Sequence, residues 1–230
     1  MRNFFKSIKP IEWVIWSVSV VAIVACFFAF GNTQYHYLVG ALIGVTALVF
    51  VSKGSPIGQA LTIAFSVFYG IISFSCKYYG EMITYLAMTA PMAIVALISW
   101  IRNPYKGNKN EVEVNKLSAK EWCLFLLLTA AVTVAFYFIL QALNTANLIV
   151  STVSVLTSFA ASYLTARRSR FYALGYAAND IVLIVLWILQ AITDITYLPM
   201  VVCFAAFLIL DVYGFINCTI MYRKQQQAEQ

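Results

Sequence analysis

Residues 171–192 read FYALGYAANDIVLIVLWILQAI, a stretch that is long and apolar enough to cross a bilayer as one helix. One carboxylate, Asp180, lies near its middle. A charged side chain at bilayer depth costs about 2.5 to 3.5 kcal/mol on insertion scales, so it persists only where it faces the interior of a helix bundle or an aqueous cavity. Asp180 therefore indicates a membrane protein with a functional site inside its bundle.

The composition of the whole chain agrees with a membrane protein. Of its 230 residues, 62% are hydrophobic and 10% are charged, whereas soluble domains carry about 25% charged residues. Apolar stretches of about 20 residues span a bilayer. Eight of them predict an all-α polytopic membrane protein, a single membrane domain over residues 1–230, with transmembrane helices at 11–30, 36–52, 57–76, 82–101, 122–141, 146–165, 171–192 and 196–222.

The basic residues predict the orientation of these helices. Lysine and arginine are retained on the cytoplasmic side of the membrane during insertion. If the N-terminus is cytoplasmic, only Lys77 of the 15 lysines and arginines falls in an outer loop. We therefore expect both termini in the cytoplasm. The net charge of +6 reflects this topology, and we expect no nucleic-acid partner.

Cysteine and histidine give no sign of a metal or a cofactor. The five cysteines are scattered through apolar segments without the paired spacing of a disulfide framework or a metal site. His36 has no second histidine with which to form a ligand pair. We expect no cofactor and no bound metal.

The second half of the chain repeats the pattern of the first. At an offset of about 114 residues, Ser66 aligns with Asp180. Two such units joined by one helix enter the membrane in the same direction, an arrangement in which transporters place a substrate site between the repeats. Ser118 and Glu121 have the spacing of a capping box that would start the connecting helix. The predicted plan is 1 + 3 + 1 + 3: an N-terminal helix at 11–30, a three-helix repeat at 36–101, a linker and connecting helix at 102–141, and a second three-helix repeat at 146–222.

Polar side chains follow one face of the helix at 171–192, at about 100° per residue. The matching face of the first repeat and the last helix add further polar groups. Because the last two helices run in opposite directions, Asp180 and Asp211 fall at similar depth and are expected to share one polar centre. The candidate substrate-binding residues are Asn179, Trp187, Asp180, Gln190, Gln59, Asp211, Asn217, Tyr176 and Tyr213.

The chemistry of this face suits a small ligand with a planar, cationic ring and a hydroxylated part. Asn179 and Gln190 offer paired donors and acceptors for hydroxyls or amides, and Trp187 offers a flat face that attracts cations. Simpler roles are the alternative. Asp180 or Asp211 could only hold the bundle together through hydrogen bonds to neighbouring helices, and Trp187 could only pack.

Three segments resemble a known family: RRSRFYALGYAANDIVLIVLW at 167–187, FLILDVYGFIN at 207–217 and SKGSPIGQ at 52–59. Over nearly its whole length the chain resembles the PnuC family of vitamin transporters, in a plan similar to that of full-length SWEET transporters. The resemblance implies uptake of nicotinamide riboside across the bacterial inner membrane by facilitated diffusion, with retention by cytosolic phosphorylation. It also implies homo-oligomers, as trimers. Relatives carry thiamine, riboflavin or deoxynucleosides.

Carried onto this sequence, the family's substrate site falls on Asn179, Trp187 and their neighbours, with Gln59 and polar residues of the last helix as further members. Trp187 would stack on the pyridinium ring of nicotinamide riboside. Asn179 and Gln190 would bind its ribose or carboxamide groups. Asp180 would offset the positive charge or order Asn179.

Three other functions use acids or polar faces inside a membrane bundle. Paired aspartates occur in intramembrane proteases, but no Gly-x-Gly-Asp motif precedes Asp180 or Asp211, so we expect no enzyme. Proton- or sodium-coupled transport is the more serious rival, although only these two acids are expected at depth. A channel is disfavoured because the polar faces carry bulky groups such as Trp187 in place of charged rings. We favour uncoupled transport by alternating access, in which the two units rock against each other.

Overall fold

The protein is described by a computed structural model for residues 9–30, 35–75, 79–145 and 147–228. Within these residues, eight helical segments are long and apolar enough to cross a membrane, which confirms the predicted fold class and number of spans. Lys77, the basic residue expected on the outer side, lies outside the described residues. The helices are α2 (Pro10–Ala29), α3 (Tyr35–Ser52), α4 (Pro56–Ser75), α5 (Tyr79–Ile83) with η1 (Thr84–Thr89) and α6 (Ala90–Arg102), α7 (Ala119–Ala142), α8 (Leu148–Ala166), α9 (Tyr172–Thr193), and α10 (Leu198–Gln227) after the short η2 (Ile195–Tyr197).

The fourth span is one helix whose middle turn, η1, is a π-helix. There the N–H of Ala90 bonds to the carbonyl of Tyr85, five residues back. Pro91 follows at once and has no N–H to donate, so the regular hydrogen-bond ladder is interrupted at this point. The widened turn changes the direction of the side chains that precede Pro91.

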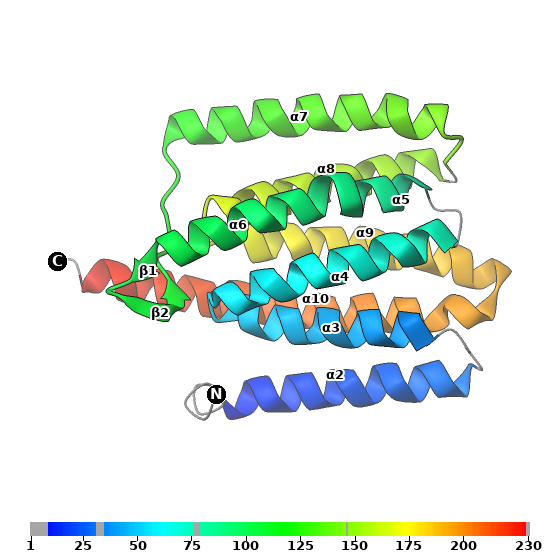
Figure 1. Cartoon of the computed structure of the whole chain (residues 1–230), viewed down its shortest axis with the longest axis horizontal. Coiled ribbons are helices and arrows are strands. Elements are labelled where there is room, and N and C mark those ends of the chain that lie inside the picture. The colour runs from blue at the N-terminus through cyan, green and yellow to red at the C-terminus, as the bar shows by residue number, and fades with distance from the viewer. Residues whose placement is uncertain (1–8, 31–34, 76–78, 146, 229–230) are drawn as a thin grey trace.

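The start of α2 and the end of α10 lie at the same end of the bundle (Figure 1), as eight antiparallel spans require. We call it the linker end, because residues 103–118 between α6 and α7 also lie there. The other end is the far end. Every described lysine and arginine lies at the linker end, either in the linker or at or next to a helix terminus. The clustering of positive charge at one end agrees with the predicted topology. That this end faces the cytoplasm stays a prediction.

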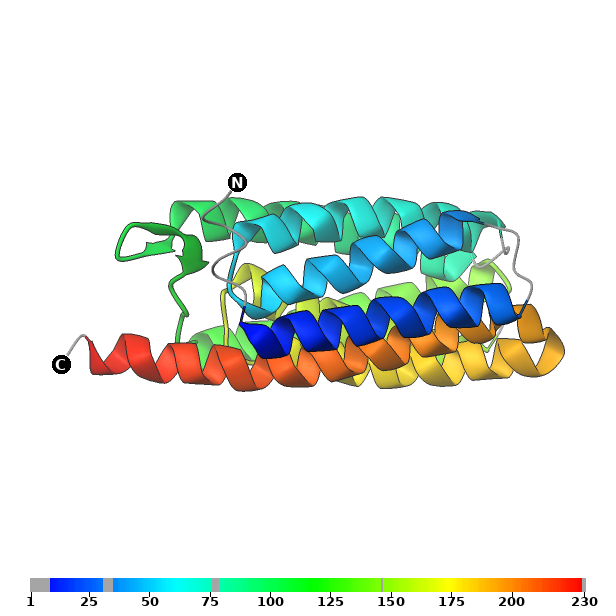
Figure 2. The ribbon, with the colours of Figure 1, turned by 90° about the horizontal axis from the view of Figure 1, so that it is seen from below.

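Six spans surround the centre of the molecule. α3 packs on α4 and α4 on α6, and in the second half α8 packs on α9 and α9 on α10. Between the halves, α3 packs against α10 and α8 against α6. α2 lies outside α3 and α10, and α7 lies outside α8, on opposite sides of the bundle (Figures 1 and 2). This reciprocal contact pattern is what two parallel repeats would produce, and the repeat itself stays a prediction.

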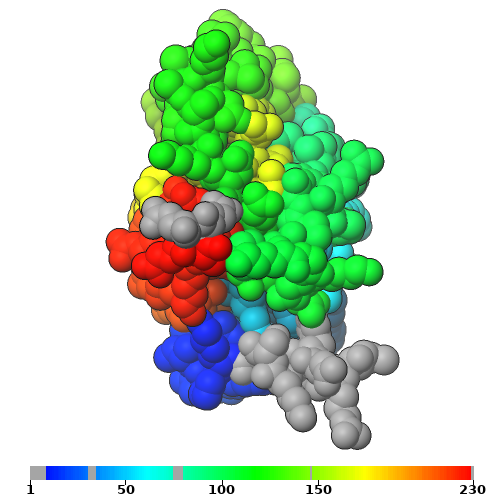
Figure 3. All heavy atoms as spheres, turned by 90° about the vertical axis from the view of Figure 1, so that its left-hand side faces the viewer, coloured from blue at the N-terminus to red at the C-terminus, as the bar shows by residue number. Residues whose placement is uncertain are grey.

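The linker, expected only as a polar connection, contains a small antiparallel hairpin of β1 (Pro104–Tyr105) and β2 (Asn108–Val112). It is held by the end of α10, which continues past the predicted boundary at residue 222. The side chain of Gln225 accepts from the N–H of Val114 at 2.8 Å and donates to the carbonyl of Val112 at 3.1 Å. Figure 3 shows the end of α10 against this part of the chain, with α2 next to it.

The turns that join α3 to α4 and α8 to α9 have the same hydrogen-bond pattern. Gly54 and Arg168, again about 114 residues apart, both have positive φ, 68° and 58°. The N–H of each of these two residues donates to the carbonyl three residues earlier in the chain. The N–H of the next residue donates to the carbonyl five residues before it. The linker binds both turns, because Val112 donates to the carbonyl of Gly54 at 3.0 Å and Asn115 to that of Arg168 at 2.9 Å.

A glutamate near the start of α2 and of α7 pairs with the base at each of these turns. Glu12 lies 3.4 Å from Lys53, and Glu121 pairs with Arg167. Glu121 also completes the predicted capping box: the N–H of Ser118 donates to its carboxylate at 2.8 Å, and the N–H of Glu121 donates to the Ser118 hydroxyl at 3.3 Å. The outer helices α2 and α7 are therefore fastened to the two halves in the same way.

Gly54→Ala should lower the apparent melting temperature of the purified protein by more than Gly107→Ala does. Both glycines have positive φ, so alanine carries a backbone strain of about 1 to 2 kcal/mol at either position. Only at Gly54 would the new methyl group crowd α10 and the linker, at 3.0 Å from Met221 Cε and 3.2 Å from Val112 Cγ1, whereas nothing lies within 4 Å at Gly107. Equal losses in the two variants would show that the linker does not pack on this turn in solution.

Candidate substrate site

A cavity of about 60 Å³ lies between the two halves of the bundle. All six central spans contribute to it, and it lies in the half of the bundle nearer the linker end. The lining residues are Gly44, Ala47, Leu48 and Val51 of α3, Gln59, Thr62 and Phe65 of α4, Tyr85 and Thr89 of η1, Ser158 and Ser162 of α8, Tyr176, Asn179 and Asp180 of α9, and Phe204, Phe207 and Asp211 of α10.

Four polar atoms of the lining are buried without a hydrogen-bond partner among the described residues. They are Gln59 Oε1, Thr89 Oγ1, Ser162 Oγ and Asp180 Oδ2, and they come from four different spans. Buried polar atoms are nearly always satisfied in native proteins. Their convergence on one pocket therefore marks a place where a polar ligand can supply the missing bonds.

Asn179 is positioned by two hydroxyl groups of α8. Thr157 and Ser158 donate to its Oδ1 at 2.8 and 2.9 Å. All four serines of α8, Ser151, Ser154, Ser158 and Ser162, are buried. Because the oxygen of Asn179 is occupied by α8, its amide N–H groups are the part of this side chain that is left to donate to a ligand.

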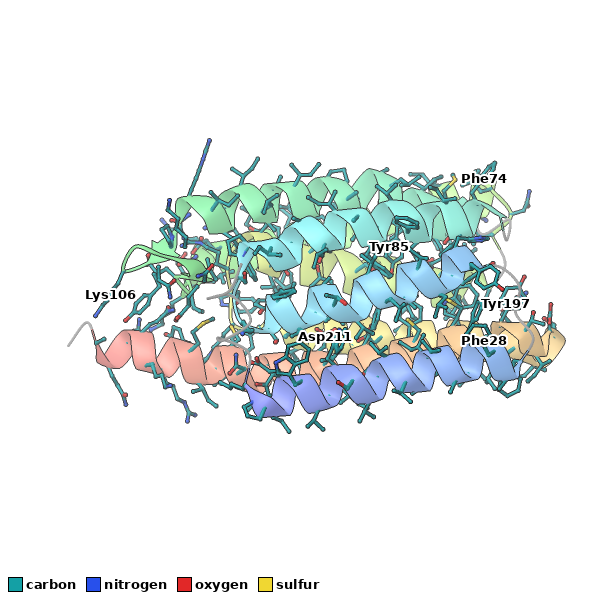
Figure 4. The ribbon with its side chains drawn as sticks, turned by 60° about the horizontal axis from the view of Figure 1, so that its bottom comes forward. Phe28, Phe74, Tyr85, Lys106, Tyr197 and Asp211 are labelled. Atoms are coloured by element: carbon teal, nitrogen blue, oxygen red, sulfur yellow. The ribbon has the colours of Figure 1, made fainter. Side chains whose placement is uncertain are left out.

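Asp180 and Asp211 meet in the pocket, as expected from their depths on antiparallel helices. Each is 4% exposed, and their carboxyl groups are in contact. Figure 4 places Asp211 in the interior of the bundle, with Tyr85 further toward the far end. Gln59 and Tyr176, also predicted, line the same pocket.

Four predicted residues lie outside the pocket lining. Trp187 is fully buried and donates its indole N–H to the Tyr69 hydroxyl at 2.9 Å. Gln190 lies in the last turn of α9. Tyr213 donates to Glu12 at 3.0 Å, and Asn217 donates to the carbonyl of Ser52 at 2.7 Å. The structure therefore places these four residues outside this cavity, and their part in substrate binding stays a prediction.

The reason is geometric. One face of a helix continues through the whole bilayer, at a rise of about 1.5 Å per residue, whereas the pocket occupies only part of that depth. Trp187 therefore lies about 10 Å beyond Asp180 along α9. Sequence periodicity indicates which face of the helix is polar but not the depth at which the pocket ends.

An aromatic cluster of Phe65, Tyr69, Tyr85, Trp187 and Phe204 closes the pocket on its far side. Three of these rings line the pocket, and the other two lie behind them. The rings of Tyr69 and Tyr85 are 4.2 Å apart between centroids, and Tyr69 also packs edge-to-face on Trp187 and Phe204. Trp187 therefore has a packing role at the far end of the site.

Packed apolar side chains close the pocket toward the linker end. Val51 of the lining belongs to a buried cluster that also contains Val112, Val114 and Leu117 of the linker. The Tyr172 hydroxyl donates to the carbonyl of Val51 at 2.7 Å and fixes α9 to α3 below the pocket. The pocket is thus bounded by side chains at both ends.

Sequence reasoning missed Tyr85, Thr89 and the phenylalanines of the lining. Tyr85 and Thr89 belong to the π-helical turn, and a regular helical period does not apply across such a turn. The site residues were chosen for their polar side chains, and this criterion does not select Phe65, Phe204 or Phe207. An aromatic residue on a polar helix face was the available clue for Phe65, because it lies one turn after Thr62 and one turn before Tyr69.

An eight-span membrane protein with a polar pocket between two halves, bounded at both ends by packed side chains, has the architecture of a carrier for small molecules. A family model described as "Nicotinamide mononucleotide transporter" matches residues 34–219. The chain belongs to this family. It is a transporter of the PnuC family and not an enzyme, which removes the intramembrane protease from consideration.

Two curated relatives agree with this assignment. The nicotinamide riboside transporter PnuC of Neisseria mucosa is 26% identical over 214 residues, which cover 91% of this chain and 81% of the relative. The nicotinamide riboside transporter PnuC of Haemophilus influenzae is 26% identical over 226 residues, covering 97% of this chain and 96% of the relative. The crystal structure of the vitamin B3 transporter PnuC has the same fold, with a TM-score of 0.81, 24% identity and 94% coverage of each chain.

Trp187→Phe and Tyr69→Phe should each lower the apparent melting temperature, and the double variant should lose less than their sum. Each single variant leaves one buried polar group without its partner, whereas the double variant removes both. In double-mutant cycles, two residues joined by an interhelical hydrogen bond in a membrane have coupling free energies of roughly 0.6 to 1.7 kcal/mol. Thermal denaturation of all four proteins in detergent measures the coupling, and additive losses would mean that the 2.9 Å bond contributes nothing.

Proposed function

We propose that this protein takes up nicotinamide riboside across the bacterial inner membrane by facilitated diffusion. The observation that carries the proposal is the pocket between the two halves, where four unpartnered polar atoms and aromatic rings line one cavity. The names of both curated relatives support the choice of substrate. Retention of the vitamin would follow from its phosphorylation in the cytosol.

Nicotinamide riboside has a pyridinium ring, a carboxamide and a ribose, and the pocket offers a partner for each. The Asn179 amide can donate to the carboxamide oxygen or to a ribose hydroxyl. Ribose hydroxyls both donate and accept, so they can satisfy Gln59 Oε1 and the hydroxyls of Thr89 and Ser162. The lining phenylalanines and Tyr85 supply the ring-stacking surface that the sequence assigned to Trp187.

Transport by alternating access requires each end of the pocket to open in turn. Rocking of the unit α3–α6 against the unit α8–α10 would separate the aromatic cluster at the far end or the Val51 cluster at the linker end. The aromatic cluster joins α4 and η1 of one unit to α9 and α10 of the other. Both closures thus lie across the boundary along which the units would move.

The protein is proposed to work as a homo-oligomer, a trimer, with both termini in the cytoplasm. The clustering of the described lysines and arginines at the linker end supports the orientation. α2 and α7 are the least buried spans, with 22% and 17% of their residues buried, so they present the largest surface to lipid or to a neighbouring copy.

Ion-coupled transport is the second candidate, and the contact between Asp180 and Asp211 favours it. The structure also adds a further buried acid, which the predicted helix at 82–101 left outside: Glu81 is 3% exposed but does not line the pocket. Uncoupled transport is retained because no lysine, arginine or histidine of the described chain lines the pocket to complete a relay.

Asn179→Ala should weaken the binding of nicotinamide riboside by about tenfold or more, because a buried polar ligand group would lose its donor. Gln190→Ala is the matched control, since it removes an amide from the same helix outside the pocket and should change the dissociation constant less than about twofold. Isothermal titration calorimetry of the purified protein measures both. Thiamine, riboflavin and deoxyadenosine should bind the wild type more weakly, and tighter binding of any of them would overturn the proposed substrate.

Uptake of labelled nicotinamide riboside into proteoliposomes should proceed down its own gradient without a proton or sodium gradient. Adding an inward gradient of either ion at zero membrane potential should leave the initial rate unchanged, because the uncoupled cycle moves no ion. Uptake that stops when the proton or sodium gradient is removed would establish the coupled alternative. Protein-free liposomes provide the baseline.

A further inference from the structure

Asp180 of α9 and Asp211 of α10 form an acid pair with no positive partner in the pocket. Each is buried, both line the cavity, and their carboxyl groups are in contact. The titratable side chains near the pair are of types that are neutral around pH 7: Tyr85 of η1, Tyr172 and Tyr176 of α9, and Cys203 of α10. The spans α3, α4 and α8 contribute no titratable side chain to the pocket lining. No lysine, arginine or histidine is among the described residues that line the pocket.

Two ionised carboxylates in contact repel strongly in a medium of low dielectric constant. Carboxyl groups that share a site therefore keep one proton between them, as one donates a hydrogen bond to the other. One oxygen of the pair, Asp180 Oδ2, has no hydrogen-bond partner among the described residues and lies at the pocket. Such a pair presents one negative charge to a ligand.

We propose that Asp180 and Asp211 share one proton and together act as a single negative charge that selects substrates with one positive charge. This inference rests on the proposed function and adds the charge class of the substrate. The pyridinium ring of nicotinamide riboside carries one positive charge, so the loaded pocket is neutral inside the membrane. The shared proton stays on the pair throughout the cycle, which is compatible with uncoupled transport.

The pair therefore acts as a filter against neutral molecules that match the substrate in shape. A neutral ligand would leave the charge of the pair without compensation in a desolvated pocket, which is unfavourable. Riboflavin and deoxynucleosides, the substrates of other PnuC relatives, carry no positive ring. The carboxyl pair thus separates them from nicotinamide riboside by charge.

The test compares nicotinamide riboside with its reduced dihydropyridine form, which has the same ribose and carboxamide but an uncharged ring. Calorimetry on the wild type should show at least about tenfold tighter binding of the cation. Asp180→Asn and Asp211→Asn should each keep most of this preference, because an amide replaces the protonated carboxyl and the other aspartate keeps the charge. The double variant should lose it.

Each alternative charge state gives a different result. If both acids were ionised, each single variant would lose about tenfold or more in affinity for the cation. If both were protonated, the wild type would bind the two forms equally. Either result overturns the proposal.

Two controls keep the outcome interpretable. The double variant should bind the reduced form at least as tightly as the wild type does, because it has lost the uncompensated charge, and this binding shows that it folds. Glu81→Gln removes a buried acid that does not line the pocket and should leave the preference within about threefold of the wild type. If the wild type bound neither form of the nucleoside, the proposed substrate would fail, whereas equal binding of both would leave the substrate standing and remove the charge filter.

Discussion

A carboxyl group inside a bilayer needs an enclosed polar environment, and this need shapes the centre of the molecule. Asp180 and Asp211 obtain it only because six spans from both halves surround them. The same enclosure leaves Gln59 and Asn179 with hydrogen-bonding groups directed at one cavity. The rest of the bundle then keeps water and lipid away from these groups, through aromatic rings on one side and the linker cluster on the other.

Much of the fold follows from the sequence because bilayer thickness fixes the length of each span. The start of a helix also depends on residues that are close in sequence, and the capping box of Ser118 and Glu121 is present as predicted. The linker hairpin was not predictable in this way. Its two short strands depend on contacts that are distant in sequence, above all those of Gly54 and Gln225 with Val112.

The site was predictable in part, and the limits have separate physical causes. Depth on antiparallel helices brought Asp180 and Asp211 together, as argued from the sequence. Trp187 was placed on the correct face of α9 but beyond the end of the pocket. Tyr85 and Thr89 could not be found by helical periodicity, because the π-helical turn before Pro91 changes the direction of their side chains.

Because the linker binds both equivalent turns, it also limits the distance between them. Its two contact points, Val112 and Asn115, are three residues apart, which corresponds to about 10 Å of extended chain. The turns at Gly54 and Arg168 cannot separate further than this short tether allows while both hydrogen bonds remain. Rocking that keeps both bonds would displace the two halves most at the aromatic cluster, whereas opening of the pocket at the linker end would require at least one of the two bonds to break.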